Sequence, residues 1–311
     1  DMHLFVERGL RGGISTVCAK RYSEASTSAT ERTQIMYLDA NNLYGFAMCQ
    51  ELPHSGFRWL SPALSRVSEV QRMLAESPAG RATESPAGRA PGIGHLFEVD
   101  LHYPKELHDL HNSYPLAPEA KEMPIARMSP YQHKLIEKLN LNPENVKLLT
   151  TLDDKIKYVV HEEVLKLYIK FGLQITKVHR ILEFNQSAWL KPYIEFNTEL
   201  RKKATNSFEK DFFKLMNNAV FGKTMENLRN RIKVELVLSE EAARMAKLTS
   251  SPQYVSHKIF EHGVTAINTR MTKLKLSKPV YAGQAILDLS KHLMYSFWYG
   301  HIKELYGDRQ I

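Results

Sequence analysis

Runs of apolar residues alternate along the chain with polar and proline-rich stretches. The run "TQIMYLDA", residues 33–40, has the apolar and aromatic content of a buried strand, and the turn-forming residues "NNLYG" follow it. It is therefore predicted to form a strand with Asp39 at its end. Strands are also predicted for "HLFEVDLHYP" (95–104), "IKYVVH" (156–161) and "LQITKVHRILEF" (173–184).

Other stretches carry apolar residues at helical spacing. Residues 129–141 and 162–171 are predicted to be helices, with Gly172 ending the second. Residues 192–230 are predicted to be mostly helical, and residues 278–307 to begin extended and continue as a long helix. Because helices and strands mix without regular alternation, the pattern favours an α+β fold over a doubly wound α/β sheet.

The helix predicted after Asn206 is strongly basic. Asn206 and Glu209 have the spacing of a capping box, which predicts a helix start near Ser207. On this helix one face carries Lys210, Lys214, Asn218 and Phe221 to Gly222, a surface that a flat ligand could approach. Residues 201–233 contain nine Lys or Arg and three acidic residues. A solvated helix whose lysines shield its apolar side is the simpler interpretation of such a charge run.

Composition narrows the protein class. The 311 residues are 43% hydrophobic and 24% charged, as in ordinary soluble globular proteins. Two cysteines form neither a disulfide framework nor a zinc site, and no apolar run reaches membrane-spanning length, so no membrane association is expected. The net charge of +8 favours a polyanionic partner without choosing among nucleic acid, anionic lipid and nucleotide. The missing initiator Met and the abrupt end predict a fragment of a longer protein.

Two further features carry little functional weight. The seven residues "ESPAGRA" occur twice within 76–90, which indicates a tandem duplication in a surface loop. His108 and His111 have a spacing that metal ligands use, but no third ligand stands nearby, so they are interpreted as structural or surface residues.

Three short motifs resemble the palm and fingers of family B DNA polymerases, in particular the protein-primed, organellar and viral branch that includes the Maverick/Polinton transposon enzymes. "DANNLYG" (39–45) resembles the motif Asp-x-x-Ser-Leu-Tyr-Pro, with Asn42 for Ser and Gly45 for Pro. "KLMNNAVFG" (214–222) resembles Lys-x-x-x-Asn-Ser-x-Tyr-Gly, with Ala219 for Ser and Phe221 for Tyr. "LRGG" (10–13) resembles Tyr-x-Gly-Gly, with Leu10 for Tyr.

The resemblance implies an α+β polymerase core with a mixed, mainly antiparallel palm sheet. Residues 1–60 would form the first part of the palm, 61–184 an insertion containing the duplicated loop, and 185–230 the helical fingers. Residues 231–275 would connect the fingers to a second palm segment, 276–311, that stops before the third motif, Asp-Thr-Asp. Asp308 has no second acidic residue after it and is not interpreted as that motif.

The resemblance also implies roles for individual residues. Asp39 would be catalytic and would ligate Mg²⁺, as one of two aspartates holding two ions in nucleotidyl transfer to a primer 3′-hydroxyl. Tyr44 would exclude the ribose 2′-hydroxyl, with core packing as the alternative. The nucleotide-binding residues implied are Ala40, Asn41, Asn42, Leu43, Tyr44, Lys202, Lys214, Asn218 and Phe221. The DNA-binding residues implied are Arg11, Gly12, Gly13, Lys210, Gly222 and Lys223.

The expected partners are primer-template DNA and dNTPs, with a terminal protein primer as a further candidate. A transposon copy would act in the nucleus, and a mitochondrial enzyme is the alternative. Taken alone, Asp39 is equally compatible with an Asx turn and the glycine pair with an ordinary turn. A non-catalytic transposon relic or nucleic-acid-binding module is the competing interpretation, and the fragment by itself is expected to be inactive.

Overall fold

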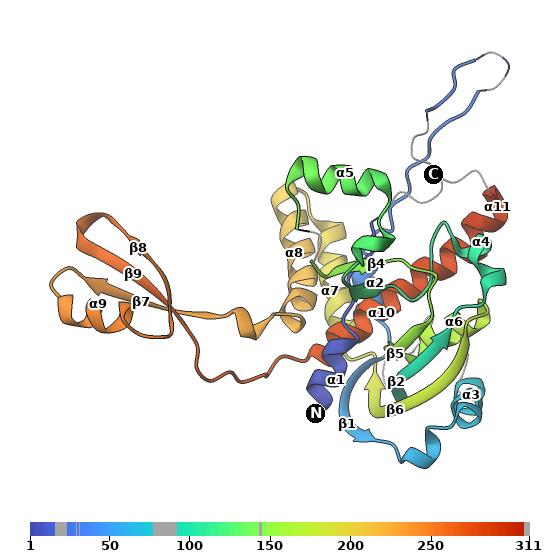
Figure 1. Cartoon of the computed structure of the whole chain (residues 1–311), viewed down its shortest axis with the longest axis horizontal. Coiled ribbons are helices and arrows are strands. Elements are labelled where there is room, and N and C mark those ends of the chain that lie inside the picture. Colours follow the sequence, from blue (N-terminus) through green and yellow to red (C-terminus); the bar gives the residue numbers. More distant parts are fainter. Residues whose placement is uncertain (16–23, 29, 31, 77–91, 143–144, 308–311) are drawn as a thin grey trace. The chain divides into compact units, whose positions relative to one another are not determined.

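The computed structural model describes residues 1–15, 24–28, 30, 32–76, 92–142 and 145–307 (Figure 1). The duplicated loop from residue 77 onward, Cys18 and Asp308 lie outside these residues. The chain divides into two compact units. The first comprises Asp1–Phe221 and Val280–Ile311, and the second comprises Gly222–Pro279.

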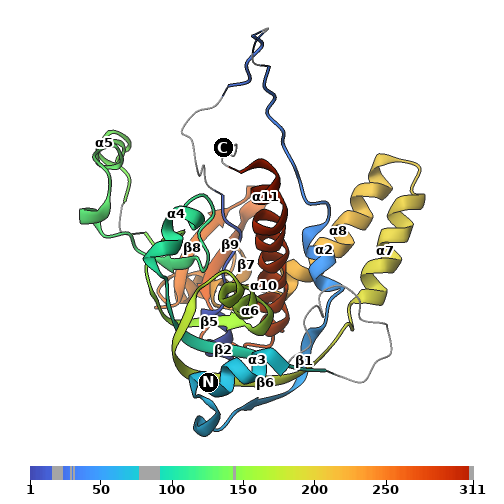
Figure 2. The ribbon, with the colours of Figure 1, turned by 90° about the vertical axis from the view of Figure 1, so that its right-hand side faces the viewer.

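A four-stranded antiparallel sheet forms the centre of the first unit. Its order is β1 (Leu52–Trp59), β6 (Gln174–Ser187), β2 (Gly92–His102) and β5 (Lys155–His161). The strands predicted over 95–104, 156–161 and 173–184 are confirmed. The curled sheet, with helices packed on it, confirms the α+β prediction (Figure 2).

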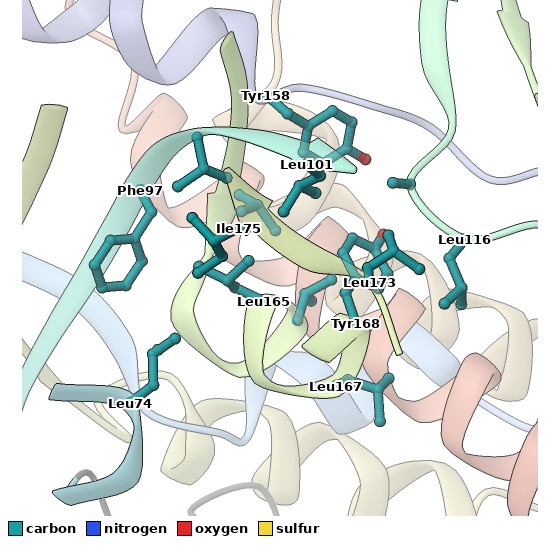
Figure 3. Close-up of a cluster of buried hydrophobic side chains, with 14 of the residues drawn as sticks. Leu74, Phe97, Leu101, Leu116, Tyr158, Leu165, Leu167, Tyr168, Leu173 and Ile175 are labelled. Atoms are coloured by element: carbon teal, nitrogen blue, oxygen red, sulfur yellow. The ribbon is translucent and has the colours of Figure 1, made fainter. Parts of the chain in front are cut away.

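The main core lies where helices cover this sheet. Helix α6 (Glu162–Lys170) contributes Leu165, Leu167 and Tyr168 to a buried cluster shared with side chains of β2, β5 and β6 (Figure 3). Helix α10 (Val280–Phe297) is almost entirely buried and packs against α6, β1 and β5. It also contacts α1 (Met2–Arg8) and α2 (Leu43–Met48), so it packs against elements from several parts of the first unit.

A helical hairpin follows β6. Helices α7 (Lys191–Lys203) and α8 (Ser207–Thr224) lie side by side, with the Tyr193 hydroxyl donating to the Met216 carbonyl at 3.3 Å. The predicted start of α8 is confirmed: Asn206 Oδ1 accepts the Glu209 amide at 2.9 Å. The Glu209 carboxylate reaches back to the Thr205 amide at 3.4 Å, one residue earlier than in a standard capping box.

The remaining elements of the first unit are short. Helices α1 (Met2–Arg8) and α2 (Leu43–Met48) pack on α10, and α3 (Val67–Glu76) packs on β6. The others are η1 (Pro62–Leu64), η2 (Lys105–Leu107), α4 (His108–His111), β3 (Glu119–Lys121), η3 (Ile125–Arg127), α5 (Pro130–Leu139), β4 (Lys147–Leu149), η6 (Trp298–Ile302) and α11 (Lys303–Tyr306). Strands β3 and β4 pair with each other.

The second unit is a three-stranded antiparallel sheet with one helix. Strand β9 (Val264–Arg270) lies between β7 (Ile232–Leu238) and β8 (Tyr254–Ile259), and α9 (Ala242–Thr249) lies on one face. Short helices η4 (Leu228–Asn230) and η5 (Glu261–Gly263) complete it. An ion pair between Arg244 and Glu235, 3.0 Å apart, joins α9 to β7.

The strand predicted over residues 33–40 is not formed. The segment is extended and exposed, with Ile35, Met36 and Tyr37 at 54, 58 and 89% of full exposure. The Thr33 amide donates to the Ser26 carbonyl at 3.0 Å, but among the described residues no strand pairs with residues 34–40. Their apolar side chains and main-chain groups therefore lack the partner that makes strand formation favourable. Asp39 therefore lies in an extended segment, not at a strand end.

One absence applies only to the described part of the chain. No helix there is long and apolar enough to cross a membrane.

His111 is buried, and its Nδ1 shares a 2.9 Å hydrogen bond with the Tyr103 hydroxyl. Its burial and this hydrogen bond identify it as a packing residue.

Candidate functional site

The turn after Asp39 is shaped by the residues that follow it. Asn42 adopts a left-handed backbone conformation (φ +56°), and its carbonyl accepts the Phe46 amide at 2.9 Å, so it caps α2. The Asn42 side chain lies directly over Gly45, where a Cβ atom would stand 2.0 Å from Asn42 Nδ2. Glycine at this position therefore lets the asparagine fold back over the first turn of α2.

The Asp39 carboxylate is exposed and has no hydrogen bond or ion pair with any residue that the structure describes. No group of three or more His, Cys, Asp or Glu side chains that could hold a metal occurs in the described ranges. The Asp39 carboxylate is thus exposed and free of internal partners in the described chain, as a single carboxylate ligand of a hard cation would be.

The first two polymerase-like motifs meet through an aromatic pair. The rings of Tyr44 on α2 and Phe221 on α8 are stacked, with centroids 4.4 Å apart and planes 20° apart. Both are half-buried against a cluster formed by α2, α7 and α10, which includes Met48, Ile194 and Ile286. The fold therefore brings the start of α2 and the last turn of α8 together at one place.

The basic side chains of the helical hairpin are solvent-facing, and they differ in their partners. Lys210, Lys214 and Asn218 are exposed, and Lys214 has no ion pair within the described chain. Lys202 is held by Glu199, with Nζ 2.7 Å from the carboxylate. Unlike Lys202, Lys214 is therefore not already paired with a carboxylate and is available to bind a phosphate.

Gly222 and Lys223 belong to the second unit. The Lys223 ammonium lies 3.5 Å from Glu226. Hydrogen bonds from Arg231 and Lys278 lower the pKa of Glu226 to about 2, which keeps this carboxylate charged. Glu226 therefore pairs with three cations, Lys223, Arg231 and Lys278, so its single charge only partly neutralises Lys223.

At three motif positions, neither the space around the residue nor the backbone conformation requires a glycine. A Cβ atom at Gly12, Gly13 or Gly222 would meet nothing within 4 Å, and none of the three has positive φ. Glycine is otherwise favoured where another backbone or a ligand approaches closely. All three are exposed, so such an approach would come from outside this chain.

Arg11 is placed differently from its neighbours. Its guanidinium is buried, donates to the Val159 carbonyl at 2.6 Å and lies 3.7 Å from the centroid of the Tyr158 ring. In this arrangement the side chain satisfies groups of β5 and does not face solvent, whereas Gly12 and Gly13 do. Asp288 and Lys291, which were not predicted as site residues from the sequence, are buried beside Arg11. The available signal was the presence of two charged residues within an otherwise apolar helix.

One family of known proteins matches the chain. The family described as "DNA polymerase type B, organellar and viral" matches residues 99–303, about two-thirds of the chain. The matched part includes α8 and α10 and does not include Asp39 or the glycine pair. A comparison with curated proteins gave no match.

Solved structures of the Phi29 DNA polymerase are similar to this chain. Its complex with primer-template DNA and incoming nucleotide substrates is 14% identical over 96% of this chain and 41% of that chain, with a TM-score of 0.48. Its binary complex with primer-template DNA is 15% identical over 93% and 38% of the two chains, with a TM-score of 0.47. This chain therefore spans about two-fifths of the polymerase chains it matches.

Proposed function

Because the chain belongs to the organellar and viral type B DNA polymerases, we propose that it forms the palm and fingers of a DNA-directed DNA polymerase. Members of this family are DNA-binding nucleotidyltransferases of DNA replication, and they use divalent metal ions. The proposal rests chiefly on the stack of Tyr44 on Phe221, which joins the two motifs near exposed Asp39.

In this proposal the surface around the aromatic pair binds the incoming nucleotide. Lys214 would contact the triphosphate as a point charge, and Lys202 would add a second contact after release from Glu199. The main chain from Ala40 to Leu43 would face the phosphates, since these residues precede or begin α2 and their amides are not used by its helical bonds. Asn218 would line the base.

Tyr44 would select the sugar. Its ring is held on one side by Phe221, so it cannot easily move away from a ribose 2′-hydroxyl. A flexible side chain would yield to the extra oxygen, whereas a packed ring excludes it sterically. Phe221 in place of the tyrosine typical of this motif keeps this packing and removes one hydroxyl.

Asp39 would hold Mg²⁺. Its free carboxylate suits a hard cation, and Mg²⁺ in such sites is commonly bound by one or two carboxylates together with substrate phosphates. When bound, the metal would neutralise charge on the triphosphate. A two-ion mechanism would need a second aspartate from outside the described residues.

DNA would approach the exposed basic and glycine positions. Lys210 and Lys223 would contact phosphates, and Gly12, Gly13 and Gly222 would allow the backbone to come close. Priming by a terminal protein, an origin in a transposon and a location in the nucleus or mitochondrion also belong to this proposal. No observation favours the alternative of a non-catalytic module.

The test is nucleotide binding by the chain itself, measured with a fluorescent dATP analogue in the presence of Mg²⁺. Lys214→Ala removes one charge-assisted contact and should weaken binding by roughly 1.5–3 kcal/mol, a factor of about 12 to 160. Lys247→Ala, which removes an equally exposed lysine on α9, is the matched control and should have no effect. Equal affinities for the two variants would refute this site.

A further inference from the structure

A cluster of charged side chains is buried between α10, β5 and the segment that follows α1. Arg11, Asp288 and Lys291 are 9, 3 and 7% exposed, and Gln284 is fully buried beside them. Burying charge is costly unless each group is paired and hydrogen-bonded. The contacts of each member therefore show what the cluster holds in place.

Lys291 is bonded to the main chain of the N-terminal segment. Its ammonium donates to the Arg11 carbonyl, and its nitrogen lies 3.7 Å from Asp288 Oδ1. The other oxygen, Asp288 Oδ2, accepts from Gln284 Nε2 at 2.7 Å and from the His161 amide at 2.9 Å. Asp288 thus connects α10 to β5 and orients the lysine.

The Arg11 side chain completes the network from the opposite side. Its guanidinium donates to the Val159 carbonyl of β5 and lies over Tyr158. Arg11 is therefore held twice, by its side chain on β5 and by its carbonyl on α10. Such buried networks are poor sources of net stability, since apolar replacements often stabilise a protein as well or better. A role in fixing conformation accounts for this one better.

The fixed group is the peptide between Arg11 and Gly12. In a trans peptide the carbonyl and the following N–H point in opposite directions across a rigid plane. Lys291 draws the Arg11 carbonyl inward, so the Gly12 N–H is turned outward. Gly12 is exposed, and its N–H donates to no residue that the structure describes.

We propose that Lys291, oriented by Asp288, is a positioning residue that directs the Gly12 N–H toward a phosphate of bound DNA, while Arg11 acts as an anchor inside the protein. The phosphate ligand rests on the proposed function, whereas the holding of the peptide does not. Lys291 itself never reaches the DNA in this arrangement. Its loss consequently affects DNA binding only through residues 10–13.

Two measurements on the whole chain test this, with Lys155→Met as the matched control. Lys155 is equally buried, and its ammonium also donates to a main-chain carbonyl, that of Thr151, at 2.9 Å. Lys291→Met should speed trypsin cleavage after Arg11, followed by mass spectrometry, by about tenfold more than the control does, because the Arg11 carbonyl loses its buried donor. DNA affinity should fall by about tenfold, the loss of one hydrogen bond to a charged group.

The salt dependence of DNA binding separates an indirect role from a direct one. Removing a lysine that contacts phosphate lowers the slope of log K against log salt by about one, and Lys210→Met should do so. Lys291→Met should leave the slope unchanged, and Lys291→Arg, which keeps a donor, should restore much of the affinity. If Lys291→Met does not fold, Asp288→Asn, which still accepts the His161 amide, provides the same measurements.

Two outcomes would contradict the positioning role of Lys291. Unchanged trypsin cleavage after Arg11 would overturn the proposal, as would a slope lowered by about one. If cleavage speeds up as expected but the wild-type chain binds no DNA, the peptide is held as proposed and it is the polymerase function that fails.

Discussion

The stack between Tyr44 and Phe221 predicts how strongly the protein rejects ribonucleotides. Phe221→Ala would remove the ring on which Tyr44 rests. An aromatic pair contributes about 0.5–1.5 kcal/mol beyond its buried area, which corresponds to a factor of about 2 to 12 in the population of the stacked conformer. With centroids 4.4 Å apart and planes 20° apart, the pair is closely stacked, so the upper half of that range applies.

Discrimination between ATP and dATP should therefore fall by about 5- to 10-fold in Phe221→Ala, and by more in Tyr44→Val, which removes the ring itself. Competition of each unlabelled nucleotide against a fluorescent dATP analogue gives the ratio of dissociation constants. Phe171→Ala is the control, because half-buried Phe171 also packs on a tyrosine ring, that of buried Tyr299, with centroids 4.8 Å apart and planes tilted by 42°, in a different cluster from Tyr44.

A double-mutant cycle tests whether Phe221 affects nucleotide discrimination through Tyr44. If Phe221 acts only through Tyr44, adding Phe221→Ala to Tyr44→Val should change the ratio no further. An unchanged ratio in Phe221→Ala, together with a lowered ratio in Tyr44→Val, would show that the stack does not support the sugar filter. An unchanged ratio in both would remove Tyr44 from the site.

Two further predictions concern single ionisable groups. Asp39→Asn should weaken dATP binding in Mg²⁺ and leave it unchanged or slightly stronger in EDTA, because without metal the carboxylate only repels the triphosphate. Asp109→Asn, at an exposed aspartate of α4, is the control. Equal effects of the two variants would contradict a metal role for Asp39. Burial, followed by the charges of Lys303 and His108, lowers the pKa of His111 to about 4 from 6.5, so as pH falls the unfolded chain is protonated first. The stability that this histidine contributes is complete above about pH 6.5 and is lost as pH falls toward 4, by about 2–3 kcal/mol between roughly pH 7.5 and 4.5. Urea unfolding of wild type and His111→Asn at both pH values should show a smaller loss in the variant, and identical losses would be inconsistent with a neutral buried histidine.

Local pattern determined most elements of this protein. The apolar runs that became β5 and β6 and the box formed by Asn206 and Glu209 before α8 act over a few residues, so their outcome can be predicted from sequence. The same holds for the αL turn at Gly172, which ends α6. The alternating apolar residues of β7 were an equally local signal that the sequence analysis did not use.

Tertiary structure decided the rest, because it depends on partners distant in sequence. Residues 33–40 have strand composition, but a strand also needs a neighbour for its main-chain hydrogen bonds, and the described chain offers none. Arg11 looked like a DNA ligand from its motif, and only the packing of β5 and α10 around it shows a buried anchor. Sequence alone indicated which residue types could bind a nucleotide. Contacts between distant segments determined that Tyr44 and Phe221 stack and that Lys291 holds the peptide before Gly12.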